Sequence, residues 1–232
     1  MPTDIEKLRA EIEALARGMG ARAFGVADLD ELRKKVPNLL DLVGDGYSRA
    51  VVFGIRLQKA AVDSVVDQPT PLYFHNYRQA NYQLDGTACL VADRLQDEGH
   101  KTLAIPASQI VQKKPMTGHI SHKLLGWAAG IGFIGRNTLL VHPLYGAQMR
   151  YVSVLTDAPL KADKPFEGGC GECVACAAVC PAKAIHESRD DFQLEACYAK
   201  LTEFTRLPFI GQHICGVCLK ACCGATGRSG RG

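Results

Sequence analysis

The sequence of 232 residues lacks any long, uninterrupted hydrophobic run. Its start, MPTDIEKLRAEIEALARG, mixes acidic with apolar residues and has no apolar core of the signal-peptide type. No later segment reaches the roughly eighteen apolar residues of a membrane span. We therefore expect a cytoplasmic protein with no membrane partner. The net charge of +3 is also small, and by itself it does not argue for nucleic-acid binding.

Cysteine is nearly missing from the first 169 residues, where Cys89 stands alone, whereas nine of the ten lie between 170 and 223. The segment 157–169, DAPLKADKPFEGG, combines Pro, Gly and charge, as domain linkers do. We therefore expect a first domain over 1–160, a cysteine-rich domain over 161–223 and a disordered tail over 224–232. For Cys89, a lone thiol among apolar residues, we expect a place in the core.

Hydrophobic periodicity in the first domain predicts both helices and strands. Thr3 and Glu6 form a capping-box pattern ahead of a helix over about 4–18, and SHKLLGWAAG predicts a short helix that ends in glycine. A long helix is predicted over about 76–98, where four residues recur near helical spacing: Tyr82, Cys89, Leu90 and Leu95. Strands are predicted in ARAFGVADL, AVVFGIRL, KTLAIPAS, NTLLVHP and MRYVSVLTD. Because helices and strands do not alternate strictly, we expect an α/β or α+β fold.

The cysteines form two motifs that resemble those of bacterial ferredoxins. CGECVACAAVCP has the spacing C-x2-C-x2-C-x3-C-P and supplies Cys170, Cys173, Cys176 and Cys180. In two-cluster ferredoxins the fourth Cys of this motif binds the other [4Fe–4S] cluster, so a second motif is expected. HICGVCLKACC supplies it with Cys215, Cys218 and Cys222, and Cys197 lies between the two motifs.

Eight ligands predict two [4Fe–4S] clusters, each of which takes ligands from both cysteine motifs. One cluster would use Cys170, Cys173, Cys176 and Cys222, and the other Cys180, Cys197, Cys215 and Cys218. Spacing leaves open whether Cys222 or its neighbour Cys223 is the ligand. The alternative is zinc held by paired CxxC knuckles, although zinc sites rarely place four cysteines so densely before a proline. Two clusters indicate a module for one-electron transfer.

GIGFIG, Gly130 to Gly135, matches the G-x-G-x-x-G pattern of dinucleotide-binding loops. That function requires a strand before the glycines and a helix after them, so that the pyrophosphate meets the start of a helix. Here a predicted helix precedes the glycines and a predicted strand follows. We therefore do not expect a nucleotide site; the glycines would instead let the backbone approach another large, flat partner.

The segment WAAGIGFIGRNTLLVHPLYGAQMRYVSVLTDAPL, followed by the two cysteine motifs, resembles epoxyqueuosine reductases and the related corrinoid-dependent reductive dehalogenases. The resemblance implies a nitroreductase-like front domain, a ferredoxin-like two-cluster domain and a bound cobalamin that receives electrons from the clusters. It also implies an external electron donor of ferredoxin or flavodoxin type, with a separate corrinoid protein as an alternative acceptor. The residues that would line the corrinoid site are Gly130, Gly132, Gly135, Arg136, Asn137 and Tyr145, with Gly146 near it.

The chain also departs from these families. Epoxyqueuosine reductases carry an acidic proton donor in an Asp-x-x-Pro segment, and the aligned position here is Met116 or Thr117. They continue into a helical-repeat domain that helps to hold tRNA, whereas this sequence stops after the second cysteine motif. A tRNA partner is therefore not expected.

Three other side chains are candidates for proton transfer. His119 and His122 lie three residues apart, on one face if their segment is helical, and His titrates near neutral pH. Tyr77 lies beside Arg78, and a neighbouring cation lowers the pKa of a tyrosine. For all three, the more ordinary interpretation is a structural role, on the surface for the histidines and in the core for the tyrosine.

Overall fold

The computed structural model describes residues 4–113 and 116–224, which fall into two compact units that interleave along the chain. Unit 1 comprises Met1–Ile55, Ala80–Ile131 and Arg150–Glu167; unit 2 comprises Arg56–Gln79, Gly132–Met149 and Gly168–Gly232. The chain enters unit 2 for the last time at Gly168, close to the predicted boundary, but two earlier segments belong to unit 2 as well. The division into two consecutive domains stays a prediction. The predicted tail beyond Gly224 and the predicted cap Thr3 lie outside the described residues.

Unit 1 is built on a four-stranded sheet in the order β1-β2-β8-β3. The strands are β1 (Ala23–Asp28), β2 (Arg49–Arg56), β8 (Met149–Thr156) and β3 (Thr102–Ile105). β1 pairs antiparallel with β2, with Gly25 opposite Val52, and β3 pairs antiparallel with β8, with Leu103 opposite Leu155. β2 and β8 are buried along almost their whole length, so both faces of the sheet are covered. A second, two-stranded sheet consists of β4 (Gln112–Lys113) and β5 (Met116–Thr117).

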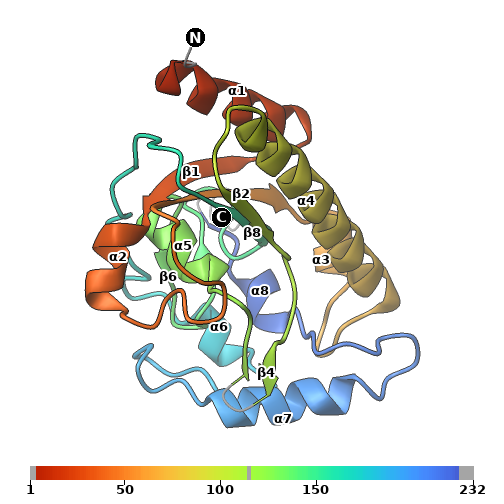
Figure 1. The fold of residues 1–232 in the computed structure, drawn as a ribbon. Coiled ribbons are helices and arrows are strands. Elements are labelled where there is room, and N and C mark those ends of the chain that lie inside the picture. The colour runs from red at the N-terminus through yellow and green to blue at the C-terminus, as the bar shows by residue number, and fades with distance from the viewer. Residues whose placement is uncertain (1–3, 114–115, 225–232) are drawn as a thin grey trace. The chain divides into compact units, whose positions relative to one another are not determined.

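Helices cover this sheet, with α1 (Ile5–Gly18) on one side of β1 and α5 (His122–Ala128) on the other (Figure 1). Asp4 caps α1 by accepting a hydrogen bond from the Glu6 amide. α5 packs closely on β1, since a Cβ on Gly25 would lie 2.2 Å from the Ala129 carbonyl oxygen. The mixed helix-and-sheet fold and each of these elements agree with the sequence-based prediction.

The long helix α4 (Pro71–Asp97) was predicted, but its buried face was not. Tyr82, Cys89 and Leu90 are exposed, and of the four residues used for the prediction only Leu95 is buried. The expectation of a core position for Cys89 is therefore wrong. The buried face follows other residues at helical spacing: Tyr73, Tyr77, Ala80, Leu84, Ala88 and Val91. Among the described residues, no helix has both the length and the hydropathy that crossing a membrane requires.

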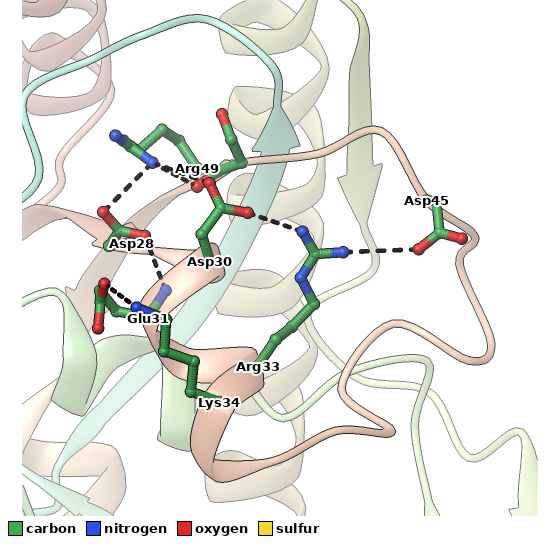
Figure 2. A network of polar contacts seen from close by, with 8 residues as sticks. Asp28, Asp30, Glu31, Arg33, Lys34, Asp45 and Arg49 are labelled. Atoms are coloured by element: carbon green, nitrogen blue, oxygen red, sulfur yellow. Dashed lines mark hydrogen bonds and ion pairs between the residues drawn. The ribbon is translucent and has the colours of Figure 1, made fainter.

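The short helix α2 (Leu29–Lys35) is held to the sheet by a network of charges. Asp28 caps it by accepting from the Glu31 amide. Figure 2 shows Arg49 beside Asp28 and Asp30, at 3.3 and 3.8 Å, and Arg33 bonded to Asp30 at 2.7 Å. Arg49 also donates to the Leu160 carbonyl, so this network ties β2 to the segment after β8.

Unit 2 contains little regular structure. Its strands are the two-residue pair β6 (Phe133–Ile134) and β7 (Leu140–Val141), so most of the predicted strand NTLLVHP is loop. Its helices, besides the start of α4, are α3 (Lys59–Asp63), α6 (Ala175–Ala178), α7 (Leu194–Phe204) and α8 (Val217–Ala221). The last three carry Cys176, Cys197 and Cys218.

Candidate metal centre

All ten cysteines lie within the described residues, and none of them forms a disulfide. In unit 2 the thiol of Cys222 interacts electrostatically with those of Cys176, Cys170 and Cys173. We call these four the Cys222 group. They come from both cysteine motifs, as the crossed arrangement requires.

The remaining four predicted ligands are also gathered together. The thiol of Cys215 interacts with those of Cys197 and Cys180, and the thiol of Cys218 with all three. We call Cys180, Cys197, Cys215 and Cys218 the Cys197 group. Cys176 also acts on Cys218, so the two groups adjoin. The structure thus brings together the same two sets of four that the spacing predicts. Their role as cluster ligands stays a prediction.

Burial keeps several of these thiols protonated in the metal-free chain. It raises the pKa of Cys222 and of Cys215 to about 11, and neighbouring thiols add to the effect. Burial likewise raises the pKa of Cys218 and Cys176. Metals bind the thiolate, so binding would release these protons. A group of four neighbouring thiols, some of them shielded from water, is costly to ionise without a metal and well suited to one.

The two cysteine groups differ from a binding site for a single metal ion. Within the part of the chain that the structure describes, no three His, Cys, Asp or Glu side chains are arranged around one metal ion. A [4Fe–4S] cube differs from such a site, because each of its thiolates binds a different iron. The donor set of the two groups, four cysteines each, fits the cube.

Arg136 holds the loop that carries the first cysteines. Its guanidinium donates to the carbonyl oxygens of Cys173 and Gly171, both at 2.9 Å, and to that of Glu187. Arg136 was predicted to line a corrinoid site, but here it binds the backbone of the cysteine loop. The sequence offers no signal for this role, because the partners are carbonyl groups that any residue possesses.

The glycines of the loop are required by the chain's own packing. A Cβ on Gly130 would lie 2.8 Å from the Lys164 carbonyl oxygen, and one on Gly132 would lie 2.2 Å from that of Val141. A Cβ on Gly135 would lie 2.8 Å from a Val141 methyl carbon and 3.4 Å from the Cys170 sulfur. The close approach expected at these glycines therefore occurs, but to neighbouring protein atoms. Their predicted contact with a corrinoid stays untested.

Gly146 likewise allows the backbone to pass close to Cys222. It has φ +62°, and a Cβ there would lie 2.0 Å from the Cys222 carbonyl oxygen. The next residue, Ala147, donates its amide to that oxygen at 3.0 Å, and Gln148 Nε2 donates to the Lys220 carbonyl at 3.1 Å. Residues 146–148 thus fix the end of α8 and its cysteine.

The two tyrosines singled out from the sequence both lie in unit 2. Tyr145 stacks on His142 with ring centroids 5.0 Å apart, and the Arg56 guanidinium lies over its ring at 5.2 Å. Tyr77 is 8% exposed and lies against Tyr73, at 6.4 Å between centroids. This placement favours a packing role for Tyr77.

Tyr73 itself supports the second cysteine motif, a contact that the sequence analysis missed. A Cβ on Gly216 would lie 2.8 Å from the Tyr73 ring, and Gly216 adopts φ +88° at the start of α8. Gly216 stands between Cys215 and Cys218, so this aromatic residue fixes the turn between two predicted ligands. The glycine inside the C-x2-C motif was the available signal.

The segment from His119 to His122 is not helical, so the condition under which the two histidines would share a helical face is not met. α5 begins at His122, after its cap Ser121, and His119 precedes the helix. The His122 ring is enclosed in unit 1, with Nδ1 2.8 Å from the Ser153 hydroxyl and Nε2 2.9 Å from the Pro106 carbonyl oxygen. Burial lowers its pKa to about 4. A carbonyl can only accept, so a neutral ring carries its proton on Nε2 and accepts from Ser153. Within the described residues, His119 Nδ1 is buried and has no hydrogen-bond partner.

Comparison with known proteins gives the relatives of this chain. No family model matches it. Epoxyqueuosine reductase from Bacillus cereus is 30% identical over 115 residues, which are 49% of this chain and 30% of the relative. Epoxyqueuosine reductase from Salmonella typhimurium is 28% identical over 213 residues, 80% of this chain and 54% of the relative. The predicted family resemblance is confirmed.

Solved structures extend the likeness to reductive dehalogenases. A reductive dehalogenase described with a mechanism for B12-dependent dehalogenation has a TM-score of 0.73 at 19% identity, covering 96% of this chain and 32% of that one. Epoxyqueuosine reductase with an epoxyqueuosine-modified tRNA-Tyr stem loop has a TM-score of 0.61 at 20% identity, covering 94% and 65%. At these identities the likeness shows a common fold. The matches span about half or less of the two curated epoxyqueuosine reductases.

The expectation that tRNA is not a partner must be corrected. It rested on Met116 or Thr117 standing at the position of the acidic proton donor and on the absence of a helical-repeat segment from this sequence. A structural neighbour that covers 94% of this chain is an epoxyqueuosine reductase bound to a tRNA stem loop. The relatives are redox enzymes, and one of the structural neighbours was solved with an RNA stem loop.

Proposed function

We propose that this chain is an iron–sulfur redox protein that serves the reduction of a small substrate at a corrinoid (cobalamin) centre. Two [4Fe–4S] clusters would be held by the Cys222 group and the Cys197 group in a ferredoxin-like arrangement, and the front part of the chain would be nitroreductase-like. Electrons would come from an external donor of ferredoxin or flavodoxin type. The observation that carries the proposal is the gathering of eight thiols into two crossed sets of four.

When bound, such clusters supply one-electron transfer over a wide range of potentials. The chain's own residues hold the cysteine-bearing segments in place. Arg136 holds the backbone of the cysteine loop, Tyr73 supports the turn at Gly216, and the Ala184 amide donates to the Cys180 sulfur at 3.3 Å. Amide donors at sulfur stabilise the thiolate and are among the features that set cluster potentials.

The corrinoid is less well supported by the residues predicted for it. Arg136 is bonded to three carbonyl groups, the three glycines of the loop lie close to atoms of the chain itself, and Tyr145 contacts the His142 ring and the Arg56 guanidinium. These contacts favour a second candidate function. In this alternative, the chain reduces a separate corrinoid protein and holds no cofactor of that kind itself.

The test is anaerobic purification and cluster reconstitution, followed by iron and zinc analysis and a spectroscopic titration with cobalamin. About eight irons per chain and a shifted corrinoid spectrum would support the reductase. Eight irons without a corrinoid response would support the activating partner. Zinc without iron would refute both. A substrate screen should include epoxyqueuosine-containing tRNA, given the relative that was solved with it.

A further inference from the structure

Asn137 has a buried side-chain amide whose oxygen is hydrogen-bonded and whose nitrogen has no partner among the described residues. The residue is 4% exposed, and its Oδ1 accepts the Leu139 amide at 3.2 Å. Its Nδ2 is buried and has no hydrogen-bond partner among the residues that the structure describes. Leaving such a donor unpaired costs about 1–3 kcal/mol, so an unpaired buried N–H calls for an acceptor.

The orientation of this amide is fixed by its surroundings. Only an oxygen can accept from the Leu139 N–H, so Nδ2 must occupy the other side. The loop around it is a tight turn, in which Thr138 adopts φ 57° and donates to the Gly135 carbonyl at 2.9 Å. Gly135 in turn donates to the Leu139 carbonyl at 3.0 Å.

The neighbour of this amide is a predicted cluster ligand. The position of a Cβ on Gly135 lies 3.1 Å from Asn137 Oδ1 and 3.4 Å from Cys170 Sγ. The Asn137 amide and the Cys170 sulfur therefore flank the same glycine. Cys170 belongs to the Cys222 group, so the Asn137 side chain lies near that proposed site.

We infer that Asn137 donates an N–H···S hydrogen bond to the cluster held by the Cys222 group and raises its reduction potential. This rests on the proposed function. Reduction adds negative charge to the cluster, and a fixed N–H dipole directed at its sulfur stabilises the reduced form more than the oxidised form. Asn137 would then be a positioning residue that sets the order of the two potentials, and its predicted corrinoid contact is not needed to explain its burial.

The experiment is an EPR-monitored redox titration of the reconstituted full chain and of two variants. Asn137→Leu removes the donor and the acceptor without adding a charge, and it is expected to lower the midpoint of one cluster by about 59 mV, which corresponds to a tenfold change for a one-electron couple. Asn137→Asp keeps the acceptor for the Leu139 amide and, when ionised, adds a negative charge, so it should lower the same midpoint further. The other midpoint serves as the internal control. Unchanged midpoints with full iron content would overturn the inference.

A second measurement decides the case if the variants lose a cluster. Wild-type protein labelled with 15N in its asparagine side chains is reduced and examined by pulsed EPR. Nitrogen coupling to a cluster is expected, and its absence would overturn the inference. Failure of the proposed function looks different, because wild-type protein would then contain no [4Fe–4S] signal at all.

Discussion

Cys222 and Cys223 are adjacent in the chain, and spacing leaves open which of them is a ligand. Cys222 interacts with Cys176, Cys170 and Cys173 and stands at the end of α8, where the Ala147 amide holds its carbonyl. Cys222→Ser should therefore lose one of two clusters, about four of about eight irons. Cys223→Ser is the matched control and should keep them all. Iron and sulfide analysis with EPR makes the measurement, and the reverse result would exchange the two roles.

His122 should make the protein sensitive to acid. Its pKa falls from 6.5 to about 4 because the ring is buried, with the charge of Arg150 acting in the same direction. An unfolded chain takes up a proton below pH 6.5 and the folded chain does not, so stability falls as the pH drops from about 6.5 to about 4. The loss amounts to about 3 kcal/mol at most.

The check is urea unfolding at several pH values between 4 and 7. His122→Gln should flatten the pH dependence in this window and also lower stability at neutral pH, since the bonds to Ser153 and Pro106 change. His75→Gln alters an exposed histidine and should leave the slope as it is. Equal slopes for wild type and His122→Gln would show that His122 is not the responsible group.

At the scale of elements, the segment after β7 and the helix α8 depend on each other through a glycine. Gly146→Ala would place a methyl group 2.0 Å from the Cys222 carbonyl oxygen, and one of the two segments must move. We expect loss of the cluster at the Cys222 group, while the other cluster remains. Gly211→Ala is the control, because Gly211 has φ +52° and its Cβ would meet open space. If both variants behave alike, backbone strain and not the contact is responsible.

The hydrogen bonds from Arg136 to three backbone carbonyl groups give a second prediction, about the loop that carries the first cysteines. Arg136→Lys keeps the charge but replaces a planar fork by one ammonium group, which cannot hold three carbonyl groups in the same directions. The loop from Gly171 to Cys173 should loosen, and the cluster should be lost several-fold faster under a chelator. Arg189→Lys, at an exposed arginine, should not change the rate. Equal chelation rates for all three proteins would remove Arg136 from this role.

These elements also show how much of the structure can be predicted from the sequence. Cysteine spacing predicts the two groups because ligand geometry leaves few alternatives. The presence of a long helix follows from periodicity, although α4 begins at Pro71 and not near 76. Its buried face does not follow, since exposed Tyr82 and Leu90 are as apolar as the residues that face the core. The sequence carries no signal for the hydrogen bonds of Arg136 to the cysteine loop or for the unpaired nitrogen of Asn137. Both depend on which backbone groups the fold brings near these side chains.

For the whole molecule, the two units should differ in their dependence on metal. Unit 1 has a continuous core that includes Leu8, Val26, Phe53, Leu125 and Leu155. After Gly168 the buried apolar side chains are few: Cys176, Ala184, Ile185, Phe204, Ile210, Ile214, Val217 and Leu219. A small core of this kind rarely suffices without metals or disulfides. Bound clusters would therefore supply much of the stability of the segment after Gly168, whereas the earlier segments of unit 2 also bury apolar side chains such as Val62 and Met149.

Two spectroscopic probes can separate the units during thermal unfolding. The single tryptophan, Trp127, lies in unit 1, where it donates to the Phe166 carbonyl at 3.1 Å. In cluster-free protein, circular dichroism should show an early transition that tryptophan fluorescence does not follow. Reconstitution should move the early transition upward and leave the fluorescence midpoint nearly unchanged. Assembly must also displace protons from thiols such as Cys222 and Cys215, so the upward shift should shrink at acidic pH. Coincident transitions in both forms would mean that the chain unfolds as one cooperative body, whose stability does not reside in its metal centres.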